Sequence, residues 1–251
     1  MSDSIKQIQN IIDKCPDKKL VFFGGAGVST ESGIPDFRSA DGLYNQKYKF
    51  PPEMLISHDF FVERTPDFFE YYLDKLIPPA ECKPNACHIG LNKLEKKGKL
   101  DAVITQNIDG LHQAAGSKRV LELHGSVHRN YCLTCHKKFN AEEICELAKQ
   151  SDDGVPRCNN GSCNGVIKPD VVLYQEPLDE NIMHQSISSI ANAHTLIIAG
   201  TSLAVYPAAG LVNYFRGKNL VIINKSTTNQ DKNADLCIND GVAKVFFQLQ
   251  L

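Results

Sequence analysis

The sequence predicts a doubly wound α/β protein with a smaller second lobe, and three observations support this fold class. Short apolar runs of the kind that fill a parallel sheet recur along the chain. Helical patterns lie between several of them, including residues 86–98 and 181–193. Two stretches, residues 40–80 and 131–165, interrupt this alternation, and we interpret them as inserts that form the second lobe. The predicted strands are residues 20–24, 100–105, 119–125, 170–174, 195–200 and 219–224.

The composition limits the class of protein further. With 251 residues, 42% of them hydrophobic, the chain suits one large domain, or one domain with a smaller insert. Its 27 basic and 29 acidic residues give a net charge of -2, so we expect no general attraction to nucleic acid or anionic lipid. No apolar run approaches the roughly 20 residues that span a bilayer, and the N-terminus lacks a signal-peptide core. We therefore expect a cytoplasmic protein.

The first element and the two inserts are predicted to be mainly helical. Four isoleucines at helical spacing predict an amphipathic helix over residues 4–14. The first insert combines five prolines with many aromatic residues and predicts a short helical cap. The second insert carries two close cysteine pairs, and its middle, AEEICELAKQ, has a helical pattern.

The first predicted strand runs into three glycines, in the segment LVFFGGAGVSTESGIPDFR of residues 20–38. Gly25 and Gly27 allow a tight turn close to phosphate oxygens, which backbone N–H groups and the N-terminus of a following helix would bind. The dinucleotide-binding fingerprint requires a third glycine at the position where this chain has Thr30. It also requires a second strand soon after the helix, but prolines interrupt residues 44–54, where that strand would lie. The segment thus predicts a nucleotide site but disfavours an ordinary dehydrogenase half-domain. Glycines that merely form a turn are the alternative interpretation.

The loop that follows strengthens the nucleotide interpretation. Pro35 stiffens a stretch that carries Asp36, Phe37 and Arg38. An acid, an aromatic ring and a guanidinium just beyond a phosphate turn are suited to form a lid over a charged ligand. Packing of Phe37 in the core is the alternative.

Polar side chains also follow the second predicted strand. Gln106, Asn107 and Asp109 stand just after residues 100–105, and ligands of open α/β sheets bind beyond the carboxyl ends of strands. Asn107 and Asp109 are suited to hold ribose hydroxyls, an amide or a water. Capping of the next helix is an equally good interpretation of the same two residues.

The third strand end provides a candidate base. His124 follows a predicted strand directly, and the pKa of histidine, about 6.5, suits proton transfer at neutral pH. His112 lies near the second strand end and is a secondary candidate. For the other histidines we expect structural roles; they are His58, His88, His128, His136, His184 and His194.

Nine cysteines in a reducing compartment indicate metal binding or burial rather than disulfides. Cys132 and Cys135 form one close pair, and Cys158 and Cys163 form a second after 22 intervening residues. Two such pairs predict a structural zinc ion held by four thiolates with no open coordination position. The remaining cysteines are expected to be buried small residues, except that Cys82 and Cys87 form a further close pair that we leave unassigned; they are Cys15, Cys82, Cys87, Cys145 and Cys237.

Two more strand ends carry small or polar residues. Gly200, Thr201 and Ser202 form a turn that could hold phosphate or ribose, and Asn224 and Lys225 stand at the next strand end. Each is an ordinary loop when taken alone. Together they indicate a ligand stretched along the sheet edge, which fits a dinucleotide better than a mononucleotide.

Five segments in this order, GAGVSTESGIPDFRS, TQNIDGLH, ELHGS, the cysteine quartet and GTSLAVYPAA, together resemble the sirtuin family of NAD-dependent protein lysine deacylases, of the bacterial type. The resemblance covers residues 5–248. It implies a Rossmann-like NAD-binding domain of residues 1–39, 89–130 and 166–251, a helical module of residues 40–88 and a zinc module of residues 131–165. NAD and an acyl-lysine peptide would enter the cleft between the domains from opposite sides.

The resemblance also implies roles for individual residues. Beside the turn residues Gly25, Gly27, Gly200 and Thr201, the residues that would contact NAD are Ala26, Thr30, Phe37, Arg38, Gln106, Ser202, Asn224, Lys225, Gly241 and Val242. Those that would line the nicotinamide and ribose pocket are Asn107, Ile108 and Asp109. Those that would line the acyl-lysine tunnel or pair with the substrate backbone are Val172, Gln175, Glu176 and Val205.

The chemistry that the resemblance implies is acyl transfer, not redox. The acetyl oxygen attacks C1′ of the nicotinamide ribose, nicotinamide leaves, and His124 removes a ribose hydroxyl proton. The acetyl group then moves onto the ribose, which gives free lysine, nicotinamide and O-acetyl-ADP-ribose. Asn107 and Asp109 would assist, and Phe37 would shield the oxocarbenium-like centre from water. NAD is thus a co-substrate, and the one resident metal is a structural zinc ion.

The sequence departs from the family pattern at two places. Members that remove succinyl or malonyl groups share a Tyr-x-x-Arg pair, whereas this chain has Tyr72 and Lys75. A lysine lacks the bidentate fork of arginine, so we expect acetyl and other neutral acyl groups as substrates. Members often carry Phe-Gly-Glu before the peptide-pairing segment, whereas this chain has Tyr174, Gln175 and Glu176.

Other functions use the same features. A protein mono-ADP-ribosyltransferase would need the same NAD cleft, and a deacylase could prefer other neutral acyl groups. A zinc module that binds nucleic acid is a third interpretation, which the acidic residues Glu142, Glu143 and Glu146 oppose. We expect acetyl-lysine proteins or peptides as partners, no stable nucleic-acid binding, no membrane association and a monomer.

Overall fold

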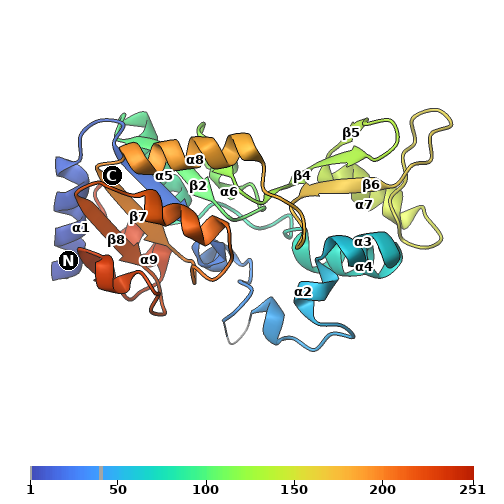
Figure 1. Cartoon of the computed structure of the whole chain (residues 1–251), viewed down its shortest axis with the longest axis horizontal. Coiled ribbons are helices and arrows are strands. Elements are labelled where there is room, and N and C mark those ends of the chain that lie inside the picture. Colours follow the sequence, from blue (N-terminus) through green and yellow to red (C-terminus); the bar gives the residue numbers. More distant parts are fainter. Residues whose placement is uncertain (1, 40–41) are drawn as a thin grey trace.

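The computed structural model describes residues 2–39 and 42–251, which form two lobes of unequal size (Figure 1). Within this part of the chain, the large lobe contains a six-stranded sheet in the order β3-β2-β1-β7-β8-β9. Every neighbouring pair in it is parallel. The order reverses beside β1, so the sheet is doubly wound, as the sequence predicts. The strands are β1 (Leu20–Gly24), β2 (Leu100–Thr105), β3 (Val120–Glu122), β7 (Thr195–Ala199), β8 (Asn219–Ile223) and β9 (Leu236–Ile238).

Helices cover both faces of this sheet, which explains why its strands are apolar throughout. All five residues of β1 and of β7 are buried. Leu20 and Phe22 pack into the core cluster beneath α1 (Asp3–Lys14), α5 (Ala86–Lys96) and α9 (Val242–Phe247). Val21 and Phe23 pack into the opposite cluster beneath α8 (Glu180–Asn192) and the 3-10 helix η5 (Ala208–Tyr214). The predicted helices over residues 4–14, 86–98 and 181–193 correspond to α1, α5 and α8.

The small lobe brings the two inserts together. Its sheet is three-stranded and antiparallel, in the order β5-β4-β6, and one aromatic-rich core joins it to the helical segment. The strands are β4 (Gly125–Cys132), β5 (Lys138–Phe139) and β6 (Ile167–Val171). The helices are α2 (Pro52–Leu55), α3 (His58–Glu63), α4 (Thr65–Tyr71), the π-helical turn η4 (Tyr72–Leu76) and α7 (Ala141–Lys149).

Two strand predictions need correction, and one strand was not predicted. The apolar run 170–174 was expected in the parallel sheet, but β6 ends at Val171 and pairs antiparallel with β4 in the small lobe. The run 119–125 divides into β3, which ends at Glu122, and the first residue of β4. Strand β9 lies in a run too short to be predicted. An apolar run predicts that a strand is buried, but it does not predict to which sheet the strand belongs.

Short elements complete the chain. The remaining ones are the 3-10 helices η1 (Ala26–Val28), η2 (Thr30–Ser32), η3 (Leu43–Asn45) and η6 (Asp231–Asn233), and the four-residue helix α6 (Leu111–Ala114). Residues 40 and 41, which begin the predicted helical module, lie outside the described residues. Strands β4 and β6 extend the small-lobe sheet beyond the predicted zinc module of residues 131–165.

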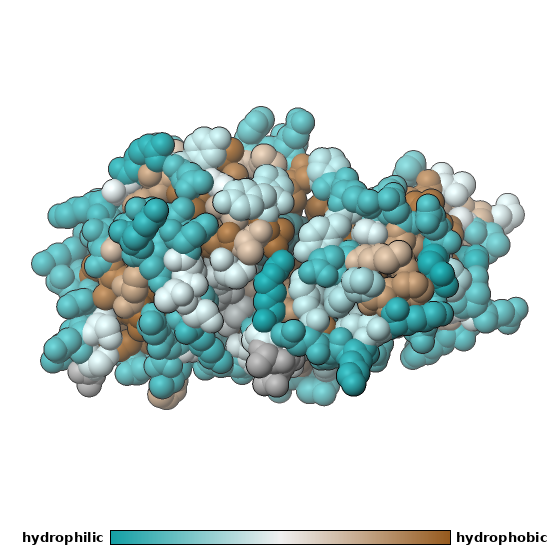
Figure 2. Space-filling view, turned by 60° about the horizontal axis from the view of Figure 1, so that its bottom comes forward, coloured by the Kyte–Doolittle hydropathy of each residue, from teal (hydrophilic) through white to brown (hydrophobic). Residues whose placement is uncertain are grey.

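The surface view places hydrophobic side chains between the two lobes, with hydrophilic side chains over most of the face around them (Figure 2). None of the described helices has the length and apolarity needed to cross a membrane.

Candidate active site

A cleft of about 790 Å³ lies between the lobes and beyond the carboxyl ends of the large sheet. Its wall contains every residue that the sequence predicts for NAD, for catalysis and for the acyl-lysine peptide. These are Gly25, Ala26, Gly27, Thr30, Phe37, Arg38, Gln106, Asn107, Ile108, Asp109, His124, Val172, Gln175, Glu176, Gly200, Thr201, Ser202, Val205, Asn224, Lys225, Gly241 and Val242. A volume of this size is that of a pocket for a small organic ligand.

The glycines after β1 are needed for packing against the turn after β7. A Cβ at Gly25 would lie 2.8 Å from Cβ of Thr201, and one at Gly27 would lie 2.8 Å from Cα of Gly200. The N–H of Gly25 donates to the carbonyl of Ala199 at 3.1 Å, and that of Gly27 donates to Gly200 at 2.8 Å. These two N–H groups are therefore occupied within the chain, so a phosphate would have to bind other N–H groups of this turn. Two single-turn 3-10 helices follow, so a long helix with its dipole does not stand at this turn either.

A buried polar cluster lies on the floor of the cleft. The hydroxyl of Ser29 donates to Oδ2 of Asp109 at 2.6 Å and accepts from the Asn107 amide at 3.0 Å. The other oxygen of Asp109 accepts from the N–H of Leu111 at 2.9 Å, at the start of α6. Asp109 does not cap α6 itself, because that helix starts after Gly110 and has no side-chain cap. One oxygen of Asp109 accepts from the backbone two residues on and the other faces Ser29, and its contact with a ligand stays a prediction. Asn107 caps no helix, since its side chain turns to Ser29.

Ser29 is a residue that the sequence analysis missed. It is 1% exposed and stands in a run of small residues where nothing in the spacing distinguishes it. Only the approach of the β1 and β2 loops brings it to Asp109, 80 positions away in the sequence.

His124 lies in the turn between β3 and β4, beside the end of β2. Its Nδ1 lies 3.0 Å from the carbonyl oxygen of Gln106 and must donate to it, because a carbonyl only accepts. Burial lowers the pKa of His124 and outweighs the opposing effect of this hydrogen bond. At neutral pH the imidazole is therefore neutral, with its proton on Nδ1 and an unprotonated Nε2.

Gly125 fixes the turn that carries His124. Its φ is +77°, and a Cβ there would overlap the carbonyl oxygen of Asp170 on β6. The N–H of Val172 donates to the carbonyl of His124 at 3.0 Å. The position of the imidazole is thus set by the junction of the two sheets.

The other candidate histidine, His112, does not reach the cleft. It is 1% exposed and packs between Phe22 and His88, with ring centroids 6.1 Å and 4.6 Å away. Burial, and to a lesser degree the neighbouring His88, lower its pKa well below the usual range. It is a core histidine.

On the small-lobe side, the segment that follows β6 is fixed to the start of α3. Gln175 has a φ of +78°, and its side chain accepts from the N–H of Asp59 at 3.0 Å and donates to the Asp59 carboxylate at 2.6 Å. The Glu176 carboxylate binds His58 at 2.9 Å and the buried Lys168 at 3.1 Å.

The charge of Glu176 is well compensated. Burial alone would raise the pKa of Glu176, but the Leu173 N–H, His58 and Lys168 together bring it below its ordinary value. The carboxylate of this predicted substrate-binding residue is therefore ionised at neutral pH and is occupied by neighbours within the chain.

The far end of the cleft, beyond β7 and β8, contains the remaining predicted NAD contacts. Gln106 donates to the hydroxyl of Thr201 at 3.0 Å. The Glu31 carboxylate accepts from the N–H of Ala243 at 3.0 Å, at the start of α9. A Cβ at Gly241 would lie 2.6 Å from that carboxylate, so a larger residue there would displace the Glu31 side chain.

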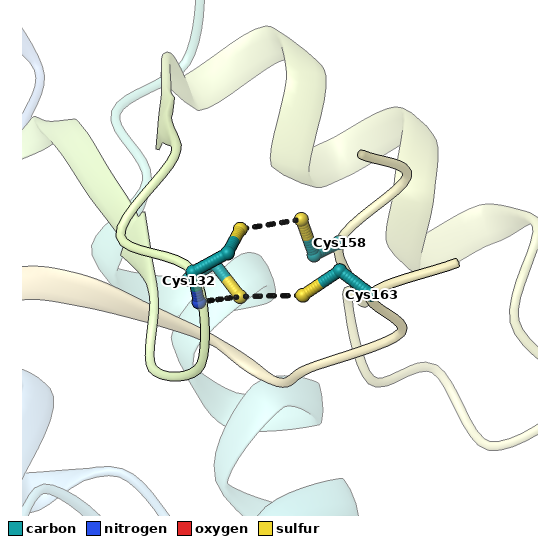
Figure 3. A group of neighbouring side chains, drawn as sticks. Cys132, Cys158 and Cys163 are labelled. Carbon is teal, nitrogen blue, oxygen red and sulfur yellow. Dashed lines mark hydrogen bonds between the residues drawn. The ribbon is translucent and has the colours of Figure 1, made fainter. Parts of the chain in front are cut away.

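The four cysteines predicted to bind zinc form a compact group in the small lobe. Figure 3 labels three of them, Cys132, Cys158 and Cys163, and shows their sulfur atoms gathered together. Their sulfur atoms all lie within 4.8 Å of one another. Two of the distances, Cys132 to Cys163 and Cys135 to Cys158, are 3.6 Å and 3.5 Å. A tetrahedral zinc ion with bonds of about 2.3 Å would separate its sulfur ligands by about 3.8 Å. The N–H groups of Thr134 and Cys135 point at the sulfur of Cys132, at 3.3 Å and 3.4 Å, as suits a thiolate. The residues therefore fit a closed structural zinc site.

The Tyr72 and Lys75 pair does not form an acidic-acyl pocket. Tyr72 is fully buried, with its ring stacked on Phe68 at 5.6 Å and 13°. Lys75 lines the cleft, but its ammonium pairs with Asp74 at 2.8 Å.

The unassigned cysteine pair does not form a site of its own. Cys87 is fully buried in α5, and Cys82 lies in the preceding loop, with its sulfur 3.8 Å from where a Cβ on Gly33 would stand.

A doubly wound sheet, a cleft lined from both lobes and a four-thiolate module define a class of two-lobed α/β protein with a nucleotide site and a structural metal. The sequence model of the Sir2 family matches residues 25–207, so the chain belongs to the Sir2 family.

Curated relatives and solved structures agree with this assignment. A Clostridium perfringens protein named NAD-dependent protein deacetylase is 58% identical over 98% of both chains. A Clostridium acetobutylicum protein of the same name is 53% identical over 97% of this chain and 96% of its own. A structure of Sir2 with a deacetylated p53 peptide and 3′-O-acetyl ADP ribose has a TM-score of 0.87 and 38% identity, and covers 97% of this chain and 96% of its own. A structure of Sir2 with a p53 peptide and NAD+ has a TM-score of 0.84 and 38% identity, and covers 99% and 97%.

Proposed function

We propose that the protein is an NAD-dependent protein lysine deacetylase that transfers the acetyl group to ADP-ribose and releases nicotinamide and free lysine. The observation that carries this proposal is a neutral imidazole, His124, in a cleft lined by all the predicted contacts of a dinucleotide. The names of the close relatives and the contents of the similar structures support the same reaction.

His124 acts as the general base. NAD supplies the electrophilic ribose carbon and the hydroxyl that becomes the acyl acceptor. The hydrogen bond from Nδ1 to Gln106 leaves the lone pair of Nε2 to accept a proton from that hydroxyl. The lowered pKa keeps the base unprotonated at neutral pH.

The Ser29, Asn107 and Asp109 cluster orients groups at the nicotinamide end. Because the Ser29 hydroxyl donates to Asp109 and accepts from Asn107, both side chains keep fixed rotamers in a water-poor site. Phe37 lies in the same wall and excludes water from the reacting sugar carbon. Away from the nicotinamide end of NAD, Arg38 and Lys225 supply positive charge that attracts the diphosphate.

The peptide lies along the segment after β6, opposite Val205. Val172 and Gln175 line the acyl-lysine tunnel or pair with the peptide backbone. Glu176 mainly holds this segment in place through its bonds to His58 and Lys168. The pairing of Lys75 with Asp74 and the burial of Tyr72 support acetyl and other neutral acyl groups as substrates.

The zinc ion is held by Cys132, Cys135, Cys158 and Cys163 and stabilises the outer part of the small lobe when bound. The domain division is proposed as residues 1–39, 89–130 and 166–251 for the NAD-binding domain, with residues 40–88 and 131–165 as the two small modules, except that strands β4 and β6 belong to the sheet of the small lobe.

The enzyme is further proposed to be a cytoplasmic monomer. Four reduced thiolates suit a reducing compartment. The exposed large apolar side chains, such as Met54, Ile89 and Phe247, belong to different elements. A molecular mass near that of one chain, 27.8 kDa, on sedimentation would support the monomer.

Product analysis tests the reaction directly. The protein is incubated with adenine-labelled NAD and acetyl-lysine, propionyl-lysine and succinyl-lysine peptides, and the products are identified by mass spectrometry. Deacetylation predicts one O-acetyl-ADP-ribose for each lysine freed. Label that ends on protein, with no lysine freed, would identify an ADP-ribosyltransferase and overturn the proposal.

A further inference from the structure

A hydrogen bond between two tyrosine hydroxyls joins two segments of the cleft wall that are far apart in the sequence. The hydroxyl oxygens of Tyr44 and Tyr174 lie 2.9 Å apart, and the two residues are 130 positions apart. Both residues line the cleft, and both are partly buried. Burial, and then the hydrogen bond to Tyr174, raise the pKa of Tyr44 far above its ordinary value, so its hydroxyl keeps its proton.

Tyr44 is bound to the loop that carries two predicted NAD contacts. Its N–H donates to the carbonyl of Phe37 at 2.8 Å. The rings of Phe37 and Tyr44 pack edge to face, with centroids 5.4 Å apart. The guanidinium of Arg38 lies over the Tyr44 ring, 5.1 Å from its centroid. The position of the Tyr44 ring therefore sets the positions of both Phe37 and Arg38.

Tyr174 belongs to the proposed peptide-pairing segment, and its backbone is held on both sides. Its N–H donates to Ile56, and its carbonyl accepts from the N–H of His58, each at 3.0 Å. The next residue, Gln175, has a positive φ that a residue with a Cβ rarely adopts, and its two bonds to Asp59 hold it there. The Tyr174 hydroxyl thus projects from a rigid base toward the NAD side.

We propose that Tyr44 and Tyr174 are positioning residues, and that their hydroxyl pair couples the NAD side of the cleft to the peptide side. A peptide that pairs beside Tyr174 fixes its ring, and the hydrogen bond passes this restraint to Tyr44, Phe37 and Arg38. By linkage, each substrate then raises the affinity of the other by the same factor. This inference rests on the proposed function for the identity of the two substrates.

The substitution that tests the pair is small. Tyr174→Phe removes one oxygen and keeps the aromatic ring in place. Tyr44→Phe removes the partner hydroxyl, and the double variant completes a thermodynamic cycle. Tyr214, which is 47% exposed and lies outside the cleft wall, provides the matched control Tyr214→Phe.

The first measurement is the affinity for an NAD analogue that cannot release nicotinamide, by calorimetry, with and without an acetyl-lysine peptide. We expect the peptide to raise this affinity in the wild type by a certain factor, which we call the coupling factor. In either single variant the coupling factor should fall by about fivefold, because that change corresponds to the net contribution of one ordinary hydrogen bond. In the double variant, this coupling factor should be no smaller than in either single variant. Tyr214→Phe should have the same coupling factor as the wild type.

The second measurement does not depend on either substrate. Trypsin cleaves after Lys47 and Lys49, which are exposed just beyond Tyr44. We expect cleavage of the unliganded protein there to accelerate by about fivefold in Tyr174→Phe, since one restraint on this stretch is lost.

The outcomes separate the two proposals. An unchanged coupling factor in an active enzyme, or single effects that add in the double variant, would overturn the role of the pair. If the wild type neither binds the analogue nor deacetylates, the proposed function fails. In that case, if trypsin cleaves the single variants no faster than the wild type, the positioning role of the pair also fails. Faster cleavage of both single variants would still support a positioning role for the hydroxyl pair.

Discussion

The Nδ1 atom of His124 lies 3.0 Å from the carbonyl oxygen of Gln106, and this contact determines which imidazole nitrogen can act as a base. The N–H of Gln106 in turn donates to the carbonyl of Gly24 at 2.9 Å, at the end of β1. The imidazole is therefore oriented by the ends of two adjacent strands of the sheet, β1 and β2. The carbonyl group of Gln106 therefore connects the orientation of the proposed base to the geometry of the sheet.

Replacing the base should abolish most of the activity. We expect His124→Tyr to lower kcat for deacetylation by about 10²- to 10⁴-fold, the usual contribution of general base catalysis. The exposed His184 on α8 provides the control His184→Tyr, which should keep full activity. Steady-state assays with an acetyl-lysine peptide measure both, and full activity of the His124 variant would exclude it as the base.

The lowered pKa of His124 predicts where activity is lost in acid. A base works in its unprotonated form, so activity is present above the pKa and falls as the pH drops through it. Because burial lowers this pKa, the midpoint of the acid limb of kcat/KM should lie below 6.5. A pH profile of kcat/KM checks this, and a midpoint above 6.5 would contradict the neutral imidazole.

Ser29 should matter for both stability and rate. In Ser29→Ala, the buried Asp109 carboxylate loses a 2.6 Å hydrogen bond and Asn107 loses its acceptor. Hydrogen bonds to charged groups contribute about 1.5–3 kcal/mol, so the free energy of unfolding should fall by about 2 kcal/mol, and kcat should fall as well. Urea unfolding and kinetics measure the two effects. Ser188→Ala on the exposed face of α8 is the control, and equal behaviour of the two variants would remove Ser29 from the site.

Local patterns in the sequence were sufficient for much of the fold. The strands that form the centre of the sheet are continuous apolar runs, because helices bury both of their faces. The four cysteines were identifiable because their spacing is that of a metal site. The candidate site residues line one cleft because the carboxyl ends of parallel strands meet at one edge of the sheet.

Features that depend on distant partners could not be read in this way. Ser29 meets Asp109, and Tyr44 meets Tyr174, only through tertiary structure, and a serine or tyrosine has no periodicity that reveals its partner. The apolar run 170–174 was placed in the wrong sheet for the same reason. The spacing of Gly25 and Gly27 likewise does not show that the turn after β7 occupies their N–H groups.

Gly125 should not tolerate a side chain. Alanine there would combine an unfavourable φ of +77° with an overlap against Asp170, so we expect Gly125→Ala to cost at least about 3 kcal/mol of unfolding free energy. Gly98 has a similar φ of +74°, but a Cβ on it would have no neighbour within 4 Å. Gly98→Ala therefore isolates the backbone strain, which should cost about 1 kcal/mol. Urea unfolding of both variants measures the difference, and equal costs would rule out the overlap.

Removal of the metal should disrupt the small lobe. We expect about one zinc ion per chain by elemental analysis, and Cys158→Ser should release it because the closed site loses one of four ligands. The helical module shares a core with the zinc-binding strands, so activity should fall together with zinc content. Cys237 is exposed, so the expectation that it is buried is wrong, and it does not belong to the cluster; Cys237→Ser is therefore the control. A Cys158 variant that keeps stoichiometric zinc would contradict the assigned ligand set.

The selectivity for neutral acyl groups should resist a single substitution toward the succinyl-type pair. Lys75→Arg restores the fork that can bind a carboxylate, but the second donor of such a pair, the Tyr72 hydroxyl, is buried and has no hydrogen-bond partner among the described residues. Its ring is stacked on Phe68, so turning it into the cleft would break the small-lobe core. We therefore expect the ratio of kcat/KM for acetyl over succinyl peptides to change by less than about tenfold in Lys75→Arg, because one arginine acting alone at a partly exposed site gains little. Desuccinylation by this variant at a rate close to deacetylation would mean that Tyr72 can leave the core.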